Sequence, residues 1–354
     1  MKIIHTTFIL WYNKHKRSLP WRLTNDPYKI WVSEIILQQT RVDQGLAYYN
    51  RFIEAFPDVF SLADAGEEQV LKCWQGLGYY SRARNMHHAA QQIVADYNGR
   101  FPDTHEEIIK LKGIGEYTAA AILSIAFNKA YPVVDGNVVR VLSRLFGIEK
   151  AYDTADGKKE ILQLATSIIS DDNPGTYNQA VMEFGALCCT PQKPGCSDCV
   201  FKKKCKALAT GTPENFPVKM VKTTVTERHY LYFVITSGSG NLKKICLRKR
   251  TTAGILKNLY DFPCIESLIP LYFNNISTHP EFQSLFGKTA VTSGKLSTEY
   301  LHKLSHISMH VRFVQIHLPK KLQKENLVWV AYNEIKQYPV PRLIEKYLAA
   351  ASIL

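Results

Sequence analysis

Apolar side chains recur every three or four positions along much of the first 205 residues, which is the spacing of amphipathic helices. The clearest runs cover residues 30–37, 70–74, 108–111 and 119–127, and short groups of Pro, Gly, Asn and Asp separate them. The pattern predicts a mostly helical region over residues 28–205.

The pattern changes after residue 207. Residues 208–226 contain Gly211, Pro213 and Pro217 and are typical of a linker. Beyond the linker, apolar and polar side chains alternate with the period of two that characterises strands. The expected strands cover residues 230–236, 244–247, 311–318 and 326–332, and a last helix covers residues 342–350. This mixture predicts an α+β domain over residues 227–354.

Length indicates the number of domains, and charge indicates the kind of binding partner. A chain of 354 residues exceeds what one hydrophobic core usually spans, so two or three domains are expected. The net charge is +13, and residues 222–354 hold 18 Lys and Arg against 8 Asp and Glu. This surplus favours a polyanionic partner, most often nucleic acid, over the alternative of a basic protein that binds none. No apolar run approaches the ~18 residues of a membrane-spanning helix, so no membrane is expected.

Four cysteines near the middle of the chain form a compact motif. The N-terminal residues do not resemble a secretory signal, so we expect a reducing compartment, in which cysteine clusters bind metals. Structural zinc sites usually contain two close cysteine pairs, whereas this motif contains one. The uneven spacing favours an iron–sulfur cluster, with zinc and structural thiols as the alternatives. The C-x6-C-x2-C-x5-C motif consists of Cys189, Cys196, Cys199 and Cys205.

A glycine hairpin lies in the sequence LKGIGEYTAAA, residues 111–121. Gly113 and Gly115 lead directly into an apolar helix, which leaves backbone N–H groups at a helix N-terminus. Such a terminus can bind a phosphate through its amides and its dipole. An ordinary turn between helices is the alternative.

Two carboxyl groups suggest acid–base chemistry. Asp135, in VVDGNVVRV, precedes a helical pattern and is expected to cap that helix; it also follows the glycine hairpin by some twenty residues. Glu34 lies among apolar residues of an expected helix, so burial should raise its pKa into the range of a general acid. The alternatives are a purely structural cap and a glutamate on a solvent-exposed helix face.

The hairpin, the VVDGNVVRV segment and the cysteine motif together resemble the helix–hairpin–helix DNA glycosylase superfamily, which contains endonuclease III. Its members of the endonuclease III type use a lysine as Schiff-base nucleophile two residues after the second hairpin glycine. This chain has Tyr117 there, and tyrosine cannot form that imine, so a monofunctional glycosylase is expected. The resemblance also implies one [4Fe–4S] cluster per chain on the four cysteines of the motif.

Three further segments resemble MutY-type adenine DNA glycosylases: SLPWR at 18–22, WVSEIILQQT at 31–40 and GLGYYSRARN at 76–85. With the earlier motifs, the resemblance covers residues 8–205. It implies a base excision repair enzyme that hydrolyses the N-glycosidic bond of adenine mispaired with 8-oxoguanine or guanine.

The resemblance assigns roles to individual residues. Glu34 is expected to protonate adenine at N7, and Asp135 to stabilise the positive charge on the sugar. Tyr117 and Asn137 are expected to position the sugar, Asp135 and water. Trp21 and Arg22 are expected to line the adenine pocket, and Glu183 either contacts adenine or is only a structural helix residue. Four residues are expected to contact the opened base pair: Gln39, Thr40, Leu77 and Tyr79. Gly113 and Gly115 are expected to bind a phosphate group.

Residues 227–354 resemble the MutT-like domain with which the same family recognises 8-oxoguanine. In KLSHISMH, residues 303–310, Ser305 and His306 match the lesion-sensing loop, whereas Leu304 replaces its usual phenylalanine. Segment 250–263 is a weaker match, with leucine and tyrosine in place of the usual tryptophans. No Nudix-type run of glutamates is present, so phosphohydrolase activity is not expected.

The expected architecture is therefore multidomain. An all-α helix–hairpin–helix glycosylase region over residues 1–207 contains the hairpin near 111–127 and the iron–sulfur loop at 189–205. The linker at 208–226 joins it to a smaller α+β, MutT/Nudix-like domain over 227–354.

The resemblance further implies a cytoplasmic, bacterial monomer that associates with the nucleoid when bound to its substrate. That substrate is double-stranded DNA containing A:8-oxoG or A:G mispairs. Two alternatives remain open at this point: an endonuclease III-type glycosylase and abasic-site lyase, and a noncatalytic iron–sulfur protein that binds DNA structures.

Overall fold

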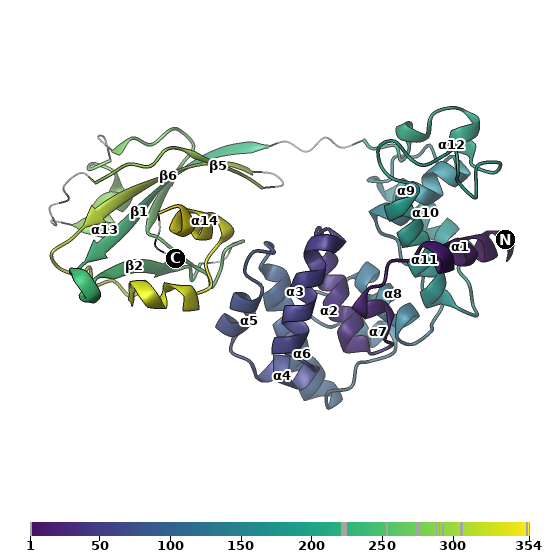
Figure 1. The fold of residues 1–354 in the computed structure, drawn as a ribbon, viewed down its shortest axis with the longest axis horizontal. Helices are drawn as coiled ribbons and strands as arrows, with labels where there is room; N and C mark the ends of the chain where they lie inside the picture. Colours follow the sequence, from purple (N-terminus) through teal and green to yellow (C-terminus); the bar gives the residue numbers. More distant parts are fainter. Residues whose placement is uncertain are drawn as a thin grey trace. The chain divides into compact units, whose positions relative to one another are not determined.

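The computed structural model describes residues 2–220, 225–252, 254–273, 276–287, 289, 291, 294–304, 307–351 and 353. The chain divides into two compact units (Figure 1). One unit comprises Met1–Asp64 and Asn85–Lys222, and the other comprises Ala65–Arg84 and Thr223–Leu354. The chain therefore enters the second unit once in its N-terminal part and returns to it after the linker.

The first unit is helical, as its apolar spacing predicts. Helix α2 shows why such segments begin where they do: Asp26 accepts the N–H of Tyr28 at 2.9 Å, and Pro27 occupies the first turn. The helices are α1 (Lys2–His15), η1 (Pro20–Arg22), α2 (Pro27–Leu37), α3 (Val42–Ala55), α4 (Val59–Asp64), α6 (Ser81–Tyr97, which begins in the other unit), α7 (His105–Ile108), α8 (Glu116–Ile125), α9 (Gly136–Phe146), α10 (Ala155–Ile168), α11 (Pro174–Leu187), α12 (Lys206–Ala209) and η2 (Pro213–Asn215).

Helix α11 packs against α1 and α9 in one hydrophobic core. The ring of Phe184 lies 5.4 Å from that of Phe8 and 4.9 Å from that of Trp11, both in α1, and each pair meets edge to face. Helix α11 leads directly into the cysteine loop. The aromatic contact therefore fixes the N-terminal helix α1 beside the helix that precedes this loop, although the two are far apart in the sequence.

Helix α11 also approaches α8 closely. A Cβ at Gly175 would lie 2.6 Å from the carbonyl oxygen of Ser124, so only glycine fits. The buried Asn178 joins the same two regions, since its amide donates to Ser124 Oγ at 2.9 Å and to the carbonyl oxygen of Tyr131 at 2.8 Å. These contacts set the distance between the helix that carries Tyr117 and the helix that carries Glu183.

The second unit is built on a seven-stranded sheet of order β3-β2-β1-β6-β5, with β4 paired to β1 and β7 paired to β2. Strands β1 and β6 are parallel and the other pairs are antiparallel. Its elements are α5 (Glu67–Cys73), β1 (Thr226–Ser237), η3 (Gly240–Leu242), β2 (Lys244–Lys249), β3 (Tyr260–Asp261), β4 (Cys264–Ser267), α13 (Pro280–Phe286), β5 (Tyr300–Lys303), β6 (Ile307–His317), β7 (Leu327–Ala331), η5 (Tyr332–Gln337) and α14 (Arg342–Ala350).

Side-chain alternation along β1 divides the sheet into two apolar faces. Phe233 points to the face covered by α13, where it meets Phe282 and Phe286. Tyr232 points to the opposite face, which α14 covers with Tyr347 among others. The sheet and its helices confirm the predicted α+β domain. None of the helices in the described part of the chain is both long and apolar enough to cross a bilayer.

We predict that Gly175→Ala lowers the free energy of unfolding by about 1–3 kcal/mol, because the added methyl group pushes α11 away from α8. A urea titration of the full chain measures the change. Gly195→Ala is the control, since its Cβ meets only the Cys188 carbonyl oxygen, at an ordinary 3.7 Å. Equal stability of the two variants would contradict the close approach of α8 and α11.

Candidate active site

A cavity of about 160 Å³ in the first unit brings together eight of the residues singled out in the sequence. Helices α2, α8 and α11, the start of α9 and the η1 turn form its wall. Its lining includes the expected residues Trp21, Arg22, Glu34, Thr40, Tyr117, Asp135, Asn137 and Glu183.

Glu34 lies on α2 with 6% of its surface exposed. Burial raises its pKa to about 7, and the nearby negative charge of Asp135 adds to the rise. The hydroxyl of Tyr117 donates to Glu34 Oε2 at 2.5 Å and opposes the rise, as does the positive charge of Arg22. A buried carboxyl group in these surroundings can hold a proton near neutral pH.

Asp135 caps α9, as expected, by accepting the Val138 N–H at 2.7 Å. The side-chain amide of Asn137 donates to the other carboxylate oxygen, also at 2.7 Å. Burial raises the pKa of Asp135, while these hydrogen bonds and the charge of Arg140 oppose the rise. The donors surrounding the carboxylate favour its ionised form.

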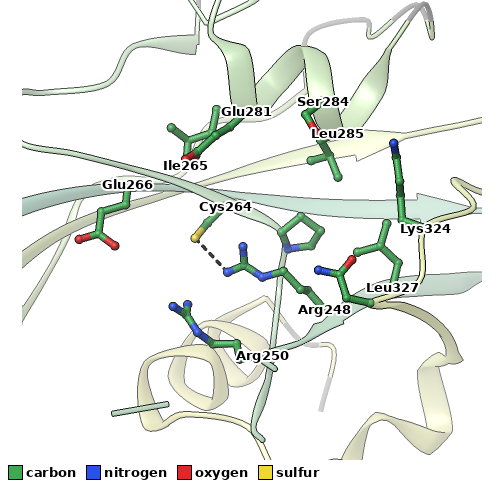
Figure 2. Close-up of a pocket in the computed structure, with 12 residues that line it drawn as sticks. Arg248, Arg250, Cys264, Ile265, Glu266, Glu281, Ser284, Leu285, Lys324 and Leu327 are labelled. Carbon is green, nitrogen blue, oxygen red and sulfur yellow. Dashed lines mark hydrogen bonds between the residues drawn. The ribbon is translucent and has the colours of Figure 1, made fainter. Parts of the chain in front are cut away.

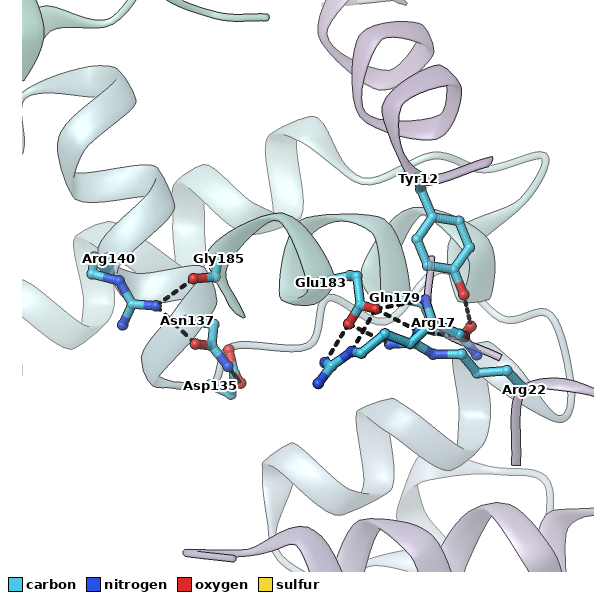
Figure 3. A network of polar contacts seen from close by, with 9 residues as sticks. All are labelled: Tyr12, Arg17, Arg22, Asp135, Asn137, Arg140, Gln179, Glu183 and Gly185. Atoms are coloured by element: carbon cyan, nitrogen blue, oxygen red, sulfur yellow. Dashed lines mark hydrogen bonds and ion pairs between the residues drawn. The ribbon is translucent and has the colours of Figure 1, made fainter. Parts of the chain in front are cut away.

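Arg140 contacts both Asn137, which holds Asp135, and the backbone at the start of the cysteine loop; Figure 3 shows its contacts with Asn137 and Gly185. Its NH2 group donates to Asn137 Oδ1 at 2.8 Å and to the Gly185 carbonyl oxygen at 2.7 Å. Its Nε donates to the Cys189 carbonyl oxygen at 2.7 Å. The orientation of Asn137, and through it that of Asp135, thus depends on backbone at the start of the loop.

Glu183 is buried on α11 between two guanidinium groups (Figure 3). Arg22 donates to its two carboxylate oxygens at 2.8 and 2.7 Å, and Arg17 does so at 2.9 and 2.6 Å. Burial alone would raise the pKa of Glu183, but these hydrogen bonds hold it at about 2. Glu183 is consequently an anion that orients two arginines beside the cavity.

Three polar residues of this region were not predicted from the sequence. Arg17 pairs with Glu183, Arg140 holds Asn137, and Gln179 accepts the hydroxyl of Tyr12 at 2.6 Å. Helical spacing could have revealed Arg140, which lies one turn after Asn137, and Gln179, which lies one turn before Glu183. Arg17 has no comparable signal.

The glycine hairpin has the expected form. Gly113 adopts a φ of +79°, and a Cβ there would lie 2.6 Å from that of Asn85. Gly115 is the N-cap residue of α8, so no side chain caps this helix, and the space where its Cβ would lie is open. Both glycines are exposed, so the α8 N-terminus is accessible to a ligand from solvent.

The other expected DNA contacts differ in exposure. Gln39 is exposed and holds a φ of +57°. Tyr79 in the second unit is 48% exposed with a φ of +47°, whereas Leu77 is only 9% exposed. Ser305 and His306 lie outside the described residues.

The four cysteines of the motif are partly exposed, and three of them pack against the core of the first unit. Cys189 Sγ receives a hydrogen bond from Arg144 at 3.4 Å, and Cys199 Sγ receives the Phe201 N–H at 3.4 Å. Among the residues that the structure describes, no three Cys, His, Asp or Glu side chains gather closely enough to bind a single metal ion.

A second cavity, of about 320 Å³, lies between the sheet and α13 in the second unit (Figure 2). Arg248 and Arg250 line it, and both pair with the fully buried Asp261, at 2.9 and 2.8 Å. Arg248 also donates to Cys264 Sγ at 3.2 Å. The arginine charges in this cavity are thus largely engaged by one carboxylate.

Both parts of the chain match known protein families. Residues 32–170 match the family described as HhH-GPD superfamily base excision DNA repair protein, and residues 231–350 match the NUDIX domain. The adenine DNA glycosylase of Buchnera aphidicola subsp. Acyrthosiphon pisum is 35% identical over 98% of this chain and 97% of its own. That of Schizosaccharomyces pombe is 32% identical over 98% of this chain and 89% of its own. A solved thermostable thymine-DNA glycosylase, 30% identical, covers 59% of this chain and 96% of its own with a TM-score of 0.55. The chain therefore belongs to the adenine DNA glycosylases of the HhH-GPD superfamily.

Proposed function

We propose that this protein is a monofunctional DNA glycosylase that excises adenine mispaired with 8-oxoguanine or guanine. The observation that carries the proposal is the pair of carboxyl groups that line one cavity in different electrostatic surroundings. Glu34 has a pKa of about 7, while Asp135 is surrounded by hydrogen-bond donors. Breaking a glycosidic bond requires this division of roles between two carboxyl groups.

Glu34 acts first. Its carboxyl proton passes to N7 of an adenine that has left the base stack and entered the cavity. The electron pair of the bond between C1′ of the sugar and N9 of adenine then moves into the base, which departs neutral. Tyr117, hydrogen-bonded to Glu34 Oε2, directs the other carboxyl oxygen toward the base.

Asp135 acts on the sugar. The departing base leaves a positive charge on the sugar ring, and the Asp135 carboxylate stabilises that charge. Asn137 holds the carboxylate through its bond to Oδ2. A water molecule then adds to C1′ and gives a proton to the Glu34 carboxylate, which restores the acid and leaves an abasic site.

Tyr117 also argues against the lyase alternative. Its side chain has no amine with which to form an imine, and its hydroxyl is engaged by Glu34. The alternative of a noncatalytic binder does not explain why a carboxyl group is buried at a cost in free energy beside a second one.

Double-stranded DNA is the proposed partner, and the bacterial cytoplasm and nucleoid the proposed location. The exposed Gly113–Gly115 turn and the uncapped α8 N-terminus suit a phosphate of the DNA backbone. The basic residues of the C-terminal region add charge for the same partner. Ser305 and His306 are the proposed contacts to 8-oxoguanine.

The cysteine loop is the proposed site of one [4Fe–4S] cluster. The donor set fits this group: Cys189, Cys196, Cys199 and Cys205 supply four thiolates, and N–H groups already donate to two of their sulfurs. When bound, the cluster supplies a rigid cross-link for a loop that contains little regular structure. Through Arg140, the same loop supports Asn137.

Single-turnover assays on duplexes with adenine opposite 8-oxoguanine, guanine or thymine test the proposal. We expect strand breaks only after alkali treatment, formed fastest opposite 8-oxoguanine, because the product is an intact strand with an abasic site. Breaks without alkali would instead support a lyase.

Glu34→Gln should slow excision at least ~100-fold while retaining duplex binding, because the amide has the same shape but cannot donate the proton.

The rate of excision should fall as pH rises through about 7, because Glu34 must be protonated and burial sets its pKa there. Tyr117→Phe removes a hydrogen bond that favours the ionised form, so the pKa rises and this limb of the pH–rate profile moves to higher pH. Tyr28→Phe, which removes a buried hydroxyl bonded to the Phe56 carbonyl oxygen, is the control. A limb that stays in place in Tyr117→Phe would show that Glu34 does not govern it.

Iron and sulfide analysis of the purified chain tests the cluster. Cys189→Ser should lose the cluster and Cys188→Ser should keep it, since the hydrogen bond from Arg144 reaches Cys189 Sγ. The two variants change neighbouring residues by the same atom, so each controls for the other. Retained iron in Cys189→Ser would exclude that residue from the ligand set.

A further inference from the structure

The loop at residues 76–80, which contains Leu77 and Tyr79, belongs to the same unit as the C-terminal sheet. Its backbone is strained at Tyr79, which has a φ of +47°, whereas the neighbouring Gly76 and Gly78, at +98° and +72°, adopt positive φ without strain. A non-glycine residue in this region costs about 1–3 kcal/mol and persists only where its surroundings impose it. Contacts with neighbouring residues must therefore hold Tyr79 in this conformation.

Part of the constraint is local. The Gly78 carbonyl oxygen accepts the Trp74 indole N–H at 3.0 Å and the Arg82 guanidinium at 3.3 Å. The Arg82 guanidinium lies 5.2 Å from the ring of Trp74 and 5.5 Å from the ring of Tyr79. Arg82 thus holds the exposed Tyr79 ring against the loop by a cation–π contact.

Further constraint comes from the start of α14 and the residues before it. Arg342 NH1 donates to the Gly76 carbonyl oxygen at 3.4 Å, and the Tyr80 hydroxyl donates to the Val340 carbonyl oxygen at 3.2 Å. Gln75 Nε2 donates to Glu345 Oε1 at 3.1 Å. Both ends of the loop are therefore held by the C-terminal part of the chain.

Helix α5, which leads into the loop, is held in the same way. Glu68 accepts Lys249 Nζ at 2.6 Å and the Tyr260 hydroxyl at 2.8 Å, and Lys72 Nζ donates to the Tyr338 carbonyl oxygen at 3.3 Å. Three elements distant in sequence, β2, β3 and the end of η5, thus hold one short helix. The loop and the sheet form one hydrogen-bonded body.

We propose that the C-terminal unit positions the 76–80 loop for opening the mispair, with Arg342 and Glu345 as positioning residues. The inference rests on the proposed function. It gives the unit that carries the proposed lesion-sensing segment a second role, which is to hold the residues that enter the base stack. Recognition of the base opposite adenine and insertion of the loop then occur on one body, so a correct pair is opened less readily than a mispair.

The test uses the full chain carrying Arg342→Ala and Glu345→Ala together. Both side chains lie at the surface or near it, and neither lines the adenine cavity. Hydrogen–deuterium exchange reports on the loop without any catalysis, and we expect faster exchange of the amides of residues 76–80. Unchanged exchange would overturn the proposal.

The second readout is base opening, followed by stopped-flow fluorescence of 2-aminopurine opposite 8-oxoguanine. We expect opening roughly three- to tenfold slower, as for the loss of one or two intramolecular hydrogen bonds. Adenine opposite an abasic analogue needs no pair opened, so its excision rate should be unchanged. Equal losses on paired and unpaired adenine would indicate general damage and overturn the positioning role.

Two controls accompany the variant. Glu345→Gln keeps an oxygen acceptor for Gln75 and should restore opening relative to Glu345→Ala. Arg228→Ala removes a cation paired with Glu266 at 3.8 Å on the same sheet and should leave exchange and opening unchanged. Failure of the proposed function itself appears separately, as absence of adenine release by the wild-type chain from every duplex.

Discussion

The removal of Glu34 from water is the constraint on which the active site depends. A carboxylate in apolar surroundings is costly, and the cost falls if the group keeps its proton. Burial of Glu34 raises its pKa to about 7, which suits the acid role proposed for it. Two helices create this environment. Helix α2 surrounds Glu34 with apolar side chains, and Tyr117 on α8 orients the carboxyl group through its hydroxyl.

Three carboxyl groups line the same cavity in three different electrostatic situations. Glu34 has one neutral donor, Asp135 has amide donors, and Glu183 has two guanidinium groups. The guanidinium donors distinguish Glu183 from the other two, since they hold its pKa at about 2 although its side chain has almost no contact with solvent. The proposed acid, the proposed stabilising anion and an anion paired with two arginines thus line a single cavity.

Much of this arrangement could be predicted from local sequence. The apolar neighbours of Glu34, the cap position of Asp135 and the glycines before Tyr117 each leave a signal within a few residues, and the fold class follows from helical and strand periodicity. The Arg17–Glu183 pair leaves none, because its partners lie 166 positions apart. Nor could spacing show that Leu77 is buried while Tyr79 is exposed, since both occupy one short glycine-rich turn.

For the same reason, the sequence does not predict that residues 65–84 group with the C-terminal sheet. Helix α5 has an ordinary amphipathic sequence, and its acidic residues would be read as solvated charges. Their partners Lys249, Asn258 and Tyr260 follow some 180 residues later, so only the fold brings them together. A turn proposed to insert into DNA must be held firmly, and here the holding contacts come from the part of the chain that carries the proposed lesion-sensing segment. Local sequence specifies the chemistry of adenine removal, whereas contacts distant in sequence fix the loop proposed to admit the base.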